Sequence, residues 1–322
     1  MSGANREGLV VYKSSRNVRV RTDDTLWLCS IRGKFRGKSR QLPVVVGDRV
    51  LFQPTAESEG VLEEILPRRN ELRRARVLGG RESPAWKSGG HRGSTSEERI
   101  IASNVDQVLV VLAARVPPPR WGLVDRVLVS GHFEQLEAAI CLNKWDQVAD
   151  DADESRRLEE AQSVYRGLGY PVFQTSMLEG QGAEALKLWV RDKLTVLSGH
   201  SGVGKSTLLN WFCPTENVPT GEVSEATGRG RHVTTAMSLY DVPDGGYLVD
   251  TPGYREYGLF NLDRHQLGRY YDEFQPFIAR CRFKDCLHVR EPKCGVLEAL
   301  ETGEISRLRY RNYRQILDTL SK

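Results

Sequence analysis

Residues 194–212, LTVLSGHSGVGKSTLLNWF, decide the fold of the central part of this chain. The stretch contains the pattern G-x-x-x-x-G-K-[ST], with Gly199, Gly204, Lys205 and Ser206 in the defining positions. An apolar segment typical of a strand precedes the pattern, and a segment typical of a helix follows it. This context predicts a phosphate-binding loop rather than a chance glycine-rich turn, because loop N–H groups and a helix N-terminus together favour an anion.

The loop predicts roles for its own residues. Lys205 would reach the β- and γ-phosphates of a nucleotide, and Ser206 would bind Mg²⁺. The glycines would let backbone N–H groups approach the β-phosphate. The residues expected around the phosphates are Gly199, His200, Ser201, Gly202, Val203, Gly204, Lys205 and Ser206.

A second motif, Asp250-Thr-Pro-Gly253, follows the strand-like segment GYLV and lies 44 residues after Ser206. An Asp at a strand end can hold Mg²⁺ through water, and the N–H of Gly253 can sense a γ-phosphate. A threonine between the two motifs can complete the magnesium shell in the triphosphate state. The spacing leaves both Thr234 and Thr235 open, and we favour Thr235.

Tyr254 follows the D-x-x-G motif, at the position where many GTPases carry a Gln that orients water. A Tyr in place of Gln predicts that the protein alone hydrolyses GTP slowly or that another group orients the water. His232 is the candidate for that group, and a packing role in the same loop is an equal alternative. The candidate catalytic residues are therefore His232, Lys205 and Thr235.

The segment Asn143-Lys144-Trp145-Asp146 follows another apolar strand and predicts a guanine site. The Asp146 carboxylate would accept from the guanine N1–H and 2-amino group, a pattern that adenine does not offer, and a missing hydrogen-bond partner gives strong discrimination. The lysine stem can lie along the base, while Asn143 would brace the phosphate loop. Thr175 and Ser176, after the segment PVF, fit a loop whose backbone closes over guanine O6.

The order of these motifs is unusual, since the base motif precedes the phosphate loop in the chain. Ordinary GTPases begin with the phosphate loop, so the domain is predicted to be circularly permuted. Apolar strands alternate with helices expected near 122–135, 152–168 and 181–193. This alternation predicts an α/β domain with a mostly parallel sheet.

Near the C-terminus, three cysteines and a histidine have the spacing C-x₄-C-x-H-x₅-C. Three thiolates and one imidazole suit a closed, structural, tetrahedral Zn²⁺ site that holds one ion, and a coincidental thiol cluster is the alternative. Phe283, Leu287 and Val289 are expected to pack locally around it. The predicted zinc ligands are Cys281, Cys286, His288 and Cys294, whereas Cys29, Cys141 and Cys213 are interpreted as buried apolar residues.

Residues 8–66 contain five short strand-like segments separated by Asp, Gly and Pro, which favour a small barrel of the OB type. The first 76 residues carry 16 Lys and Arg against 9 Asp and Glu, although the net charge of the chain is only +4. This imbalance suggests contact with a polyanion, with a solubilising surface as the alternative. Positively charged residues at every second position would share one face of an extended chain. We predict that these residues bind RNA: Arg32, Lys34, Arg36, Lys38 and Arg40.

Two further groups of arginines occur in the chain. The first is Arg68, Arg69, Arg73, Arg74 and Arg76, and the second lies on a helix expected near 304–320, with Arg307, Arg309, Arg311 and Arg314. For the helix, contact with a polyanion is slightly favoured over a solvated face.

The predicted architecture is therefore multidomain. Residues 1–76 would form an all-β, OB-type RNA-binding domain, and 77–103 a mobile linker. Residues 104–262 would form the permuted α/β GTPase domain, followed by a helical zinc-binding domain at 263–322. The chain lacks an apolar run of the roughly 18–20 residues that a membrane helix needs and shows no export signal, so we expect a cytoplasmic protein with no membrane partner. A monomer is expected.

The barrel, the permuted motif order, G-R-H-x-T-T at 230–235, D-T-P-G-Y-R-E at 250–256 and the Cys/His spacing together resemble the bacterial RsgA (YjeQ) family of GTPases. The resemblance implies a factor in late maturation of the 30S small ribosomal subunit that binds 16S rRNA, GTP and GDP. It implies hydrolysis stimulated by that subunit and release afterwards. By position it extends the phosphate contacts to Thr207 and aligns His232 with a histidine suspected of aiding hydrolysis.

Two other functions are compatible with parts of the sequence. One is an RNA-binding assembly scaffold whose site binds guanine nucleotide without hydrolysing it. Tyr254 in place of the usual Gln makes this alternative worth testing. The intact Lys205, Ser206 and Asp250 argue against it. The other is a metal-delivery GTPase with the Cys/His cluster as its cargo site, and the complete set of four ligands argues against that.

Overall fold

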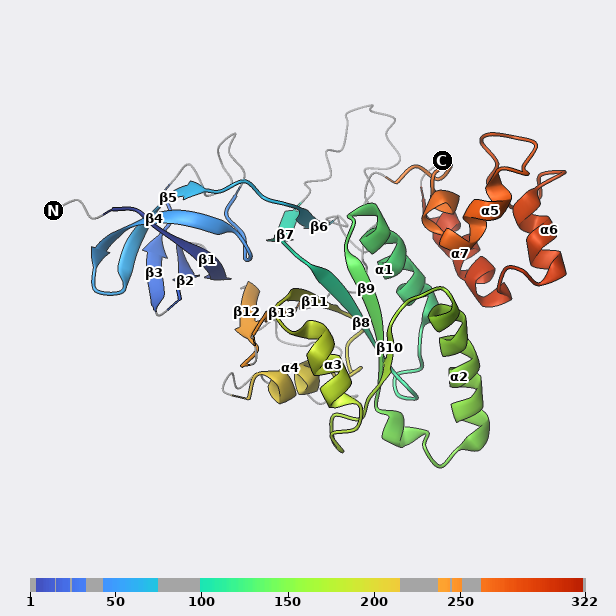
Figure 1. The fold of residues 1–322 in the computed structure, drawn as a ribbon, viewed down its shortest axis with the longest axis horizontal. Helices are drawn as coiled ribbons and strands as arrows, with labels where there is room; N and C mark the ends of the chain where they lie inside the picture. The colour runs from blue at the N-terminus through green and yellow to red at the C-terminus, as the bar shows by residue number, and fades with distance from the viewer. Residues whose placement is uncertain are drawn as a thin grey trace, which may run out of the picture. The chain divides into compact units, whose positions relative to one another are not determined.

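A computed structural model describes residues 4–14, 16–23, 25–32, 43–74, 99–214, 237–243, 245–250 and 262–320. The chain divides into two compact units, residues 1–104 and 105–322 (Figure 1). The predicted domain boundaries at residues 76, 103 and 262 remain predictions.

The first unit contains the five-stranded barrel that the sequence predicts. Its strands are β1 (Arg6–Lys13), β2 (Asn17–Arg21), β3 (Leu26–Ser30), β4 (Arg49–Ala56) and β5 (Glu59–Ile65). Hydrogen bonds join them in the closed order β1-β2-β3-β5-β4-β1, and only the β3–β5 pair is parallel. Closure leaves this sheet without an open edge.

The barrel core follows from the period-2 alternation of the strands. In β3, Trp27 and Cys29 are buried while Leu26 and Leu28 face outward. The Trp27 ring packs against Phe52 with 5.2 Å between centroids. Alternation therefore fills the interior with one face of each strand and leaves the other face at the surface.

A two-stranded sheet completes this unit. β6 (Glu71–Arg74) pairs with β7 (Arg99–Ser103) in antiparallel register. The last five residues of the predicted linker are therefore a strand rather than a loop, because Ile101 and Ala102 are buried. Residues 75–98 lie outside the described residues.

Arg68, the first residue of the arginine cluster at 68–76, does not contribute to a basic surface. Its guanidinium forms a buried ion pair with Asp48, with 2.6 Å between Nε and Oδ1, and a second pair with Glu71. Ser103 also donates to Asp48 Oδ1 at 2.6 Å. A charge that pairs in the interior in this way is not available to a polyanion.

The second unit contains a six-stranded sheet in the order β10-β9-β8-β11-β13-β12. Its strands are β8 (Gln107–Ala113), β9 (Glu137–Asn143), β10 (Val172–Gln174), β11 (Leu194–Ser198), β12 (Met237–Asp241) and β13 (Tyr247–Asp250). All pairs are parallel except β12–β13. This is the mostly parallel sheet expected of an α/β domain.

Helices cover both faces of this sheet (Figure 1). They are α1 (Trp121–Phe133), α2 (Ala152–Gly167), α3 (Ala183–Val190) and α4 (Lys205–Phe212). Leu109 and Val111 of β8 belong to one core with apolar residues of α3 and α4. Gly131 of α1 approaches Val108 on the other face. All seven residues of β8 are buried for this reason.

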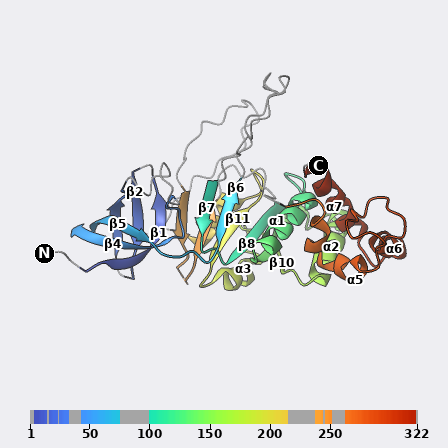
Figure 2. The same cartoon turned by 90° about the horizontal axis from the view of Figure 1, so that it is seen from above.

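The C-terminal part consists of short helices and two longer ones. They are η4 (Leu267–Tyr270), η5 (Asp272–Phe274), α5 (Gln275–Ile278), α6 (Gly295–Thr302) and α7 (Arg307–Thr319). An aromatic-rich core that includes Tyr271, Phe274 and Tyr313 holds them together. Figure 2 shows α7 beside α1. Among the described helices, none has the length and apolar character needed to span a membrane.

Candidate nucleotide and metal sites

The predicted phosphate loop connects β11 to α4, as the sequence pattern requires. Lys205, the first residue of α4, donates from Nζ to the carbonyl oxygens of Gly199 at 2.7 Å and His200 at 2.9 Å. These bonds hold the ammonium group against the backbone of the loop. The positive charge therefore lies where the sequence places phosphate oxygens.

Two glycines of the loop occupy positions that exclude a side chain. Gly204 has φ +100°, and a Cβ built on it would lie 2.2 Å from Asn143 Nδ2. A Cβ on Gly199 would lie 2.3 Å from the carbonyl oxygen of Val111. Glycine is required here by close packing against β8 and the base motif as well as by backbone conformation.

The base motif at the end of β9 is joined directly to the phosphate loop. Asn143 Nδ2 donates to the carbonyl oxygen of Val203 at 3.0 Å, which is the brace that the sequence predicts. Lys144 Nζ donates to the carbonyl oxygen of Gly202 at 2.6 Å and to that of Val116 at 2.9 Å. The two predicted halves of the nucleotide site therefore form one hydrogen-bonded assembly.

The Thr175 side chain orients the asparagine, whereas the sequence predicted for Thr175 only a place in the loop over guanine O6. Its hydroxyl donates to Asn143 Oδ1 at 3.2 Å, and its carbonyl oxygen accepts from the N–H of Trp145 at 3.0 Å. The buried Cys141 thiol lies 3.3 Å from the same hydroxyl, and burial raises its pKa to about 12. A protonated thiol can donate to Thr175 Oγ1, which leaves the threonine proton for Asn143.

Two buried oxygens at the predicted base site have no hydrogen-bond partner within the described part of the chain. They are Oδ1 of Asp146 and Oγ of Ser176. A buried, unsatisfied acceptor costs roughly 1–3 kcal/mol, so such atoms indicate a place for a ligand. An acceptor-only carboxylate such as that of Asp146 fits the N1–H and 2-amino donors of guanine.

Residues predicted to bind Mg²⁺ are only partly described. Ser206 is the second residue of α4 and is half-buried. The backbone of Asp250 ends β13 and is in register with Leu197 of β11, next to the phosphate loop. The Asp250 side chain, His232, Thr235 and Gly253 lie outside the described residues.

The basic segment of the barrel is likewise described only at its start. Arg32 is half-exposed and forms an ion pair with Glu63, with 2.5 Å between Nη2 and Oε1. Lys34, Arg36, Lys38 and Arg40 lie outside the described ranges. RNA binding by this segment therefore remains a prediction.

The four predicted zinc ligands converge, with their ligand atoms all within 4.8 Å of one another. Cys281 Sγ lies 3.8 Å from Cys294 Sγ and 3.5 Å from His288 Nδ1, which is 3.3 Å from Cys294 Sγ. Tetrahedral zinc with bonds of about 2.0–2.3 Å sets its ligands about 3.6–3.8 Å apart. The donor set and spacing therefore fit a zinc ion.

The surroundings of this cluster favour a bound cation. Burial raises the pKa of the Cys286 thiol to about 12, so a cation would be needed to hold it as a thiolate. Leu287 and Val289 pack against the C-terminal core as expected. Phe283 does not, since its side chain is 40% exposed.

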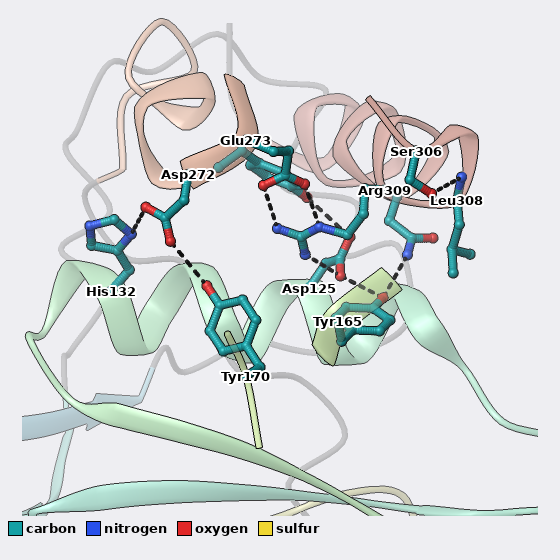
Figure 3. Close-up of polar contacts among 11 residues, drawn as sticks. Asp125, His132, Tyr165, Tyr170, Asp272, Glu273, Ser306, Leu308 and Arg309 are labelled. Atoms are coloured by element: carbon teal, nitrogen blue, oxygen red, sulfur yellow. Dashed lines mark hydrogen bonds and ion pairs between the residues drawn. The ribbon is translucent and has the colours of Figure 1, made fainter. Parts of the chain in front are cut away.

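Arg309 of α7 is a buried structural residue rather than a polyanion contact, which corrects the sequence interpretation. Its side chain is 1% exposed (Figure 3). Its Nη1 lies 2.6 Å from Asp125 Oδ1, and its Nε lies 2.6 Å from Glu273 Oε1. The guanidinium also lies 4.5 Å from the centre of the Tyr271 ring. The arginine therefore joins α7 to α1 and to η5.

Further polar contacts extend this junction to α2. Tyr165 donates from its hydroxyl to Asp125 Oδ1 at 2.8 Å. At the edge of the same junction, Asp272 accepts from Tyr170 at 3.5 Å and lies 3.5 Å from His132 Nδ1 (Figure 3). The C-terminal region is thus fixed to two helices that flank the sheet carrying the nucleotide site.

Comparison with known proteins identifies the family. The family model for the RsgA GTPase matches residues 87–260, and the model for the RsgA N-terminal domain matches residues 7–62. A protein of Chlorobaculum parvum named small ribosomal subunit biogenesis GTPase RsgA is 40% identical over 283 residues, which are 87% of this chain and 86% of the relative. The protein of the same name from Thermotoga maritima is 38% identical over 310 residues, covering 96% and 94% of the two chains.

Solved structures agree with this result. The crystal structure of YjeQ from Thermotoga maritima superposes with a TM-score of 0.74 at 34% identity and covers 98% of each chain. YloQ, described as a circularly permuted GTPase, superposes with a TM-score of 0.72 at 26% identity over 99% of this chain and 97% of that one. The permuted order of the nucleotide motifs, the barrel and the Cys/His cluster are thus explained together: the chain belongs to the RsgA family of GTP-hydrolysing enzymes.

Proposed function

We propose that this GTPase acts in late maturation of the 30S small ribosomal subunit. It would bind 16S rRNA, hydrolyse GTP faster on the subunit, and leave after hydrolysis. The names of its relatives support a role in small-subunit biogenesis. The observation that carries the proposal is the direct link of the base motif to the phosphate loop through Asn143 and Lys144.

In this proposal some residues recognise the guanine base, and others bind the phosphates or promote hydrolysis. Asp146 reads the guanine edge, Trp145 and Ser176 line the base site, and Lys205 stabilises the charge that develops on the phosphates. His232 orients or activates water. The phosphates are held by Gly199, His200, Ser201, Gly202, Val203, Gly204, Ser206 and Thr207, with Gly253 sensing the γ-phosphate.

Ser206, Asp250 and Thr235 are the proposed holders of Mg²⁺, which neutralises charge on the β- and γ-phosphate oxygens when bound. The Ser206 hydroxyl is positioned by the start of α4, and the Asp250 backbone by its register with β11. Since β11 and β13 are neighbours, both groups approach the nucleotide from the carboxyl edge of the sheet.

The Cys/His cluster is proposed to hold one structural Zn²⁺. All four ligand atoms face one another, and Cys286, His288 and Cys294 are buried in the C-terminal core. A complete set of protein ligands leaves no open coordination position, which disfavours metal delivery.

The barrel is proposed to contact rRNA through Arg32, Lys34, Arg36, Lys38 and Arg40. Cations alternating along a chain can follow a phosphate backbone, and such binding weakens as salt rises. A ribosomal partner would place the protein in the cytoplasm, and we propose that it acts as a monomer. Membership of a GTPase family disfavours the alternative of a passive scaffold.

The proposal is tested by co-sedimentation with purified small ribosomal subunits. We expect binding with a non-hydrolysable GTP analogue and loss of binding with GDP. Asp146→Asn is the control, because it removes the carboxylate that reads guanine and should abolish the effect of the analogue. Equal binding in both nucleotide states would exclude release driven by hydrolysis.

A further inference from the structure

Val116, in the loop that follows β8, is held at both of its backbone polar groups by side chains of one other segment. Its N–H donates to Oε1 of Gln147 at 3.1 Å, and its carbonyl oxygen accepts from Nζ of Lys144 at 2.9 Å. The Val116 side chain is 60% exposed, so burial of that side chain does not fix the loop. The lysine of the base motif and the residue that follows the motif therefore position Val116 through its backbone.

Lys144 and Gln147 lie at opposite ends of a single turn. Lys144 is the N-cap of the short helix η3 (Trp145–Gln147), and the N–H of Gln147 donates to the carbonyl oxygen of Lys144 at 3.1 Å. The backbone of Lys144 has φ +60°, a left-handed conformation that is uncommon for a residue with a side chain. This tight turn brings the two side chains to the same residue of the loop after β8.

The bond to Val116 is one of two that hold the Lys144 ammonium group. The other acceptor is the carbonyl oxygen of Gly202 in the phosphate loop, at 2.6 Å. The lysine stem passes beside Gly204, since a Cβ built on that glycine would lie 4.0 Å from Lys144 Cε. A shift of the Val116 carbonyl would remove one of these two charge-assisted bonds and allow the stem to move away from the phosphate loop.

Two other contacts of this loop fix the carbonyl less closely. The N–H of Ala114 donates to the carbonyl oxygen of Asn143 at 2.8 Å, which extends the β8–β9 pairing by one residue but ends before the carbonyl in question. Arg115 forms an ion pair with Asp151, but the two side chains are 43% and 45% exposed, and such surface pairs contribute little. The amide oxygen of Gln147 is therefore the group that orients this part of the loop.

We propose that Gln147 is a positioning residue for the binding of guanine nucleotides. Its amide oxygen holds the N–H of Val116, which keeps the Val116 carbonyl where it accepts from Lys144. Lys144 in turn keeps its stem beside the phosphate loop. The inference rests on the proposed function, in which this stem lies along the guanine base. Gln147 acts through Lys144 and is not a catalytic residue.

Gln147→Met tests this role, because it keeps the length of the side chain and removes the acceptor oxygen. We expect the Kd for GDP, measured on the full-length protein by displacement of a fluorescent GDP, to rise about fivefold, since a hydrogen bond contributes about 1 kcal/mol and 1.4 kcal/mol is tenfold in affinity. Gln147→Glu retains an oxygen at the same position and should restore the affinity to within about twofold of the wild type. Gln266→Met, the same change at an exposed position of the C-terminal region, is the matched control. An unchanged Kd in Gln147→Met would overturn the proposal.

Amide hydrogen exchange at Val116 reports on the hydrogen bond itself. In protein labelled with ¹⁵N-valine, the Val116 N–H signal is assigned by its loss in Val116→Ile. We expect this N–H to exchange about fivefold faster in Gln147→Met than in the wild type and at the wild-type rate in Gln147→Glu. The same exchange rate in all three proteins would show that the Gln147 oxygen does not hold the loop.

A double-mutant cycle tests whether Gln147 acts through Lys144. Lys144→Met removes the ammonium group that donates to Val116, so adding Gln147→Met to this variant should change the Kd for GDP by less than about 1.5-fold. A fivefold effect in both backgrounds would overturn the proposal, because it would show that Gln147 acts independently of Lys144. If Lys144→Met leaves the Kd unchanged, the proposed role of the lysine at the base fails as well. These titrations contain no ribosomal subunits, so small subunits that stimulate the wild type while Gln147→Met binds GDP normally would exclude only the role of Gln147.

Discussion

Arg309 of α7 and Asp125 of α1 form an ion pair with 2.6 Å between Nη1 and Oδ1, and their side chains are 1% and 0% exposed. The two residues are 184 positions apart in the sequence. Glu273 Oε1 accepts from Arg309 Nε, and the Tyr165 hydroxyl donates to the same Asp125 Oδ1. The pair therefore defines how the metal-bearing region packs against the enzyme's sheet and helices.

Removing one partner of this pair should destabilise the protein. Arg309→Met leaves the Asp125 carboxylate buried without its main counter-charge, and a broken buried pair costs about 3–5 kcal/mol. We expect the free energy of unfolding in urea to fall by that amount. Arg311→Met, on the exposed face of the same helix, should change it by less than about 0.5 kcal/mol. Equal effects of the two variants would contradict the structural role of Arg309.

Thr175→Val should weaken nucleotide binding without impairing the chemical step. The change removes the hydroxyl that donates to Asn143 Oδ1, and a hydrogen bond contributes about 1 kcal/mol. We expect the Kd for GDP to rise about fivefold and kcat to stay constant once GTP saturates. Thr175→Ser keeps the hydroxyl and should restore affinity. A variant in which kcat alone falls would show that Thr175 does not act through the base motif.

Gly268→Ala should loosen the metal site. A Cβ at this position would lie 3.0 Å from Nε2 of His288, so the imidazole ring must shift to admit it. We expect faster loss of zinc to a chelator, monitored with a colorimetric indicator. Gly167→Ala is the control, because a Cβ there meets nothing within 4 Å. Identical rates of zinc loss in the two variants would show that the His288 ring does not depend on this packing.

Glu291 should contribute stability that is lost in acid. Although burial opposes the shift, N–H groups of Val289, Arg290 and Leu287 lower its pKa from 4.5 to about 2. A depressed folded-state pKa stabilises the protein above pH 4.5, and this contribution disappears as pH falls toward 2. Urea unfolding of wild type and Glu291→Gln should therefore differ most at neutral pH and converge in acid. A difference that stays constant with pH would exclude ionisation as its source.

Local sequence patterns were sufficient to predict the parts of the molecule whose chemistry lies within a short segment. The glycines and lysine of residues 199–205 predict their own loop, and the five short strand-like segments of residues 8–66 predict the barrel. The four metal ligands converge because their spacing within 14 residues permits it. Asn143 was expected to brace the phosphate loop, and its bond to Val203 confirms this.

Sequence reasoning failed where a residue's role depends on a distant partner. Arg309 and Arg68 look like surface cations, but Asp125 and Asp48 pair with them in the interior. The Thr175 hydroxyl acts on Asn143, 32 residues away, and no local pattern signals that contact. A buried polar partner is set by tertiary packing, which the periodicity of one segment does not reveal.

In the proposed function, hydrolysis of GTP is coupled to the small ribosomal subunit. The most direct measurement is phosphate release from GTP by the purified protein, alone and with small or large ribosomal subunits. We expect slow release by the protein alone, strong stimulation by small subunits and no stimulation by large subunits. Equal rates in all three conditions, with tight GTP binding retained, would contradict it.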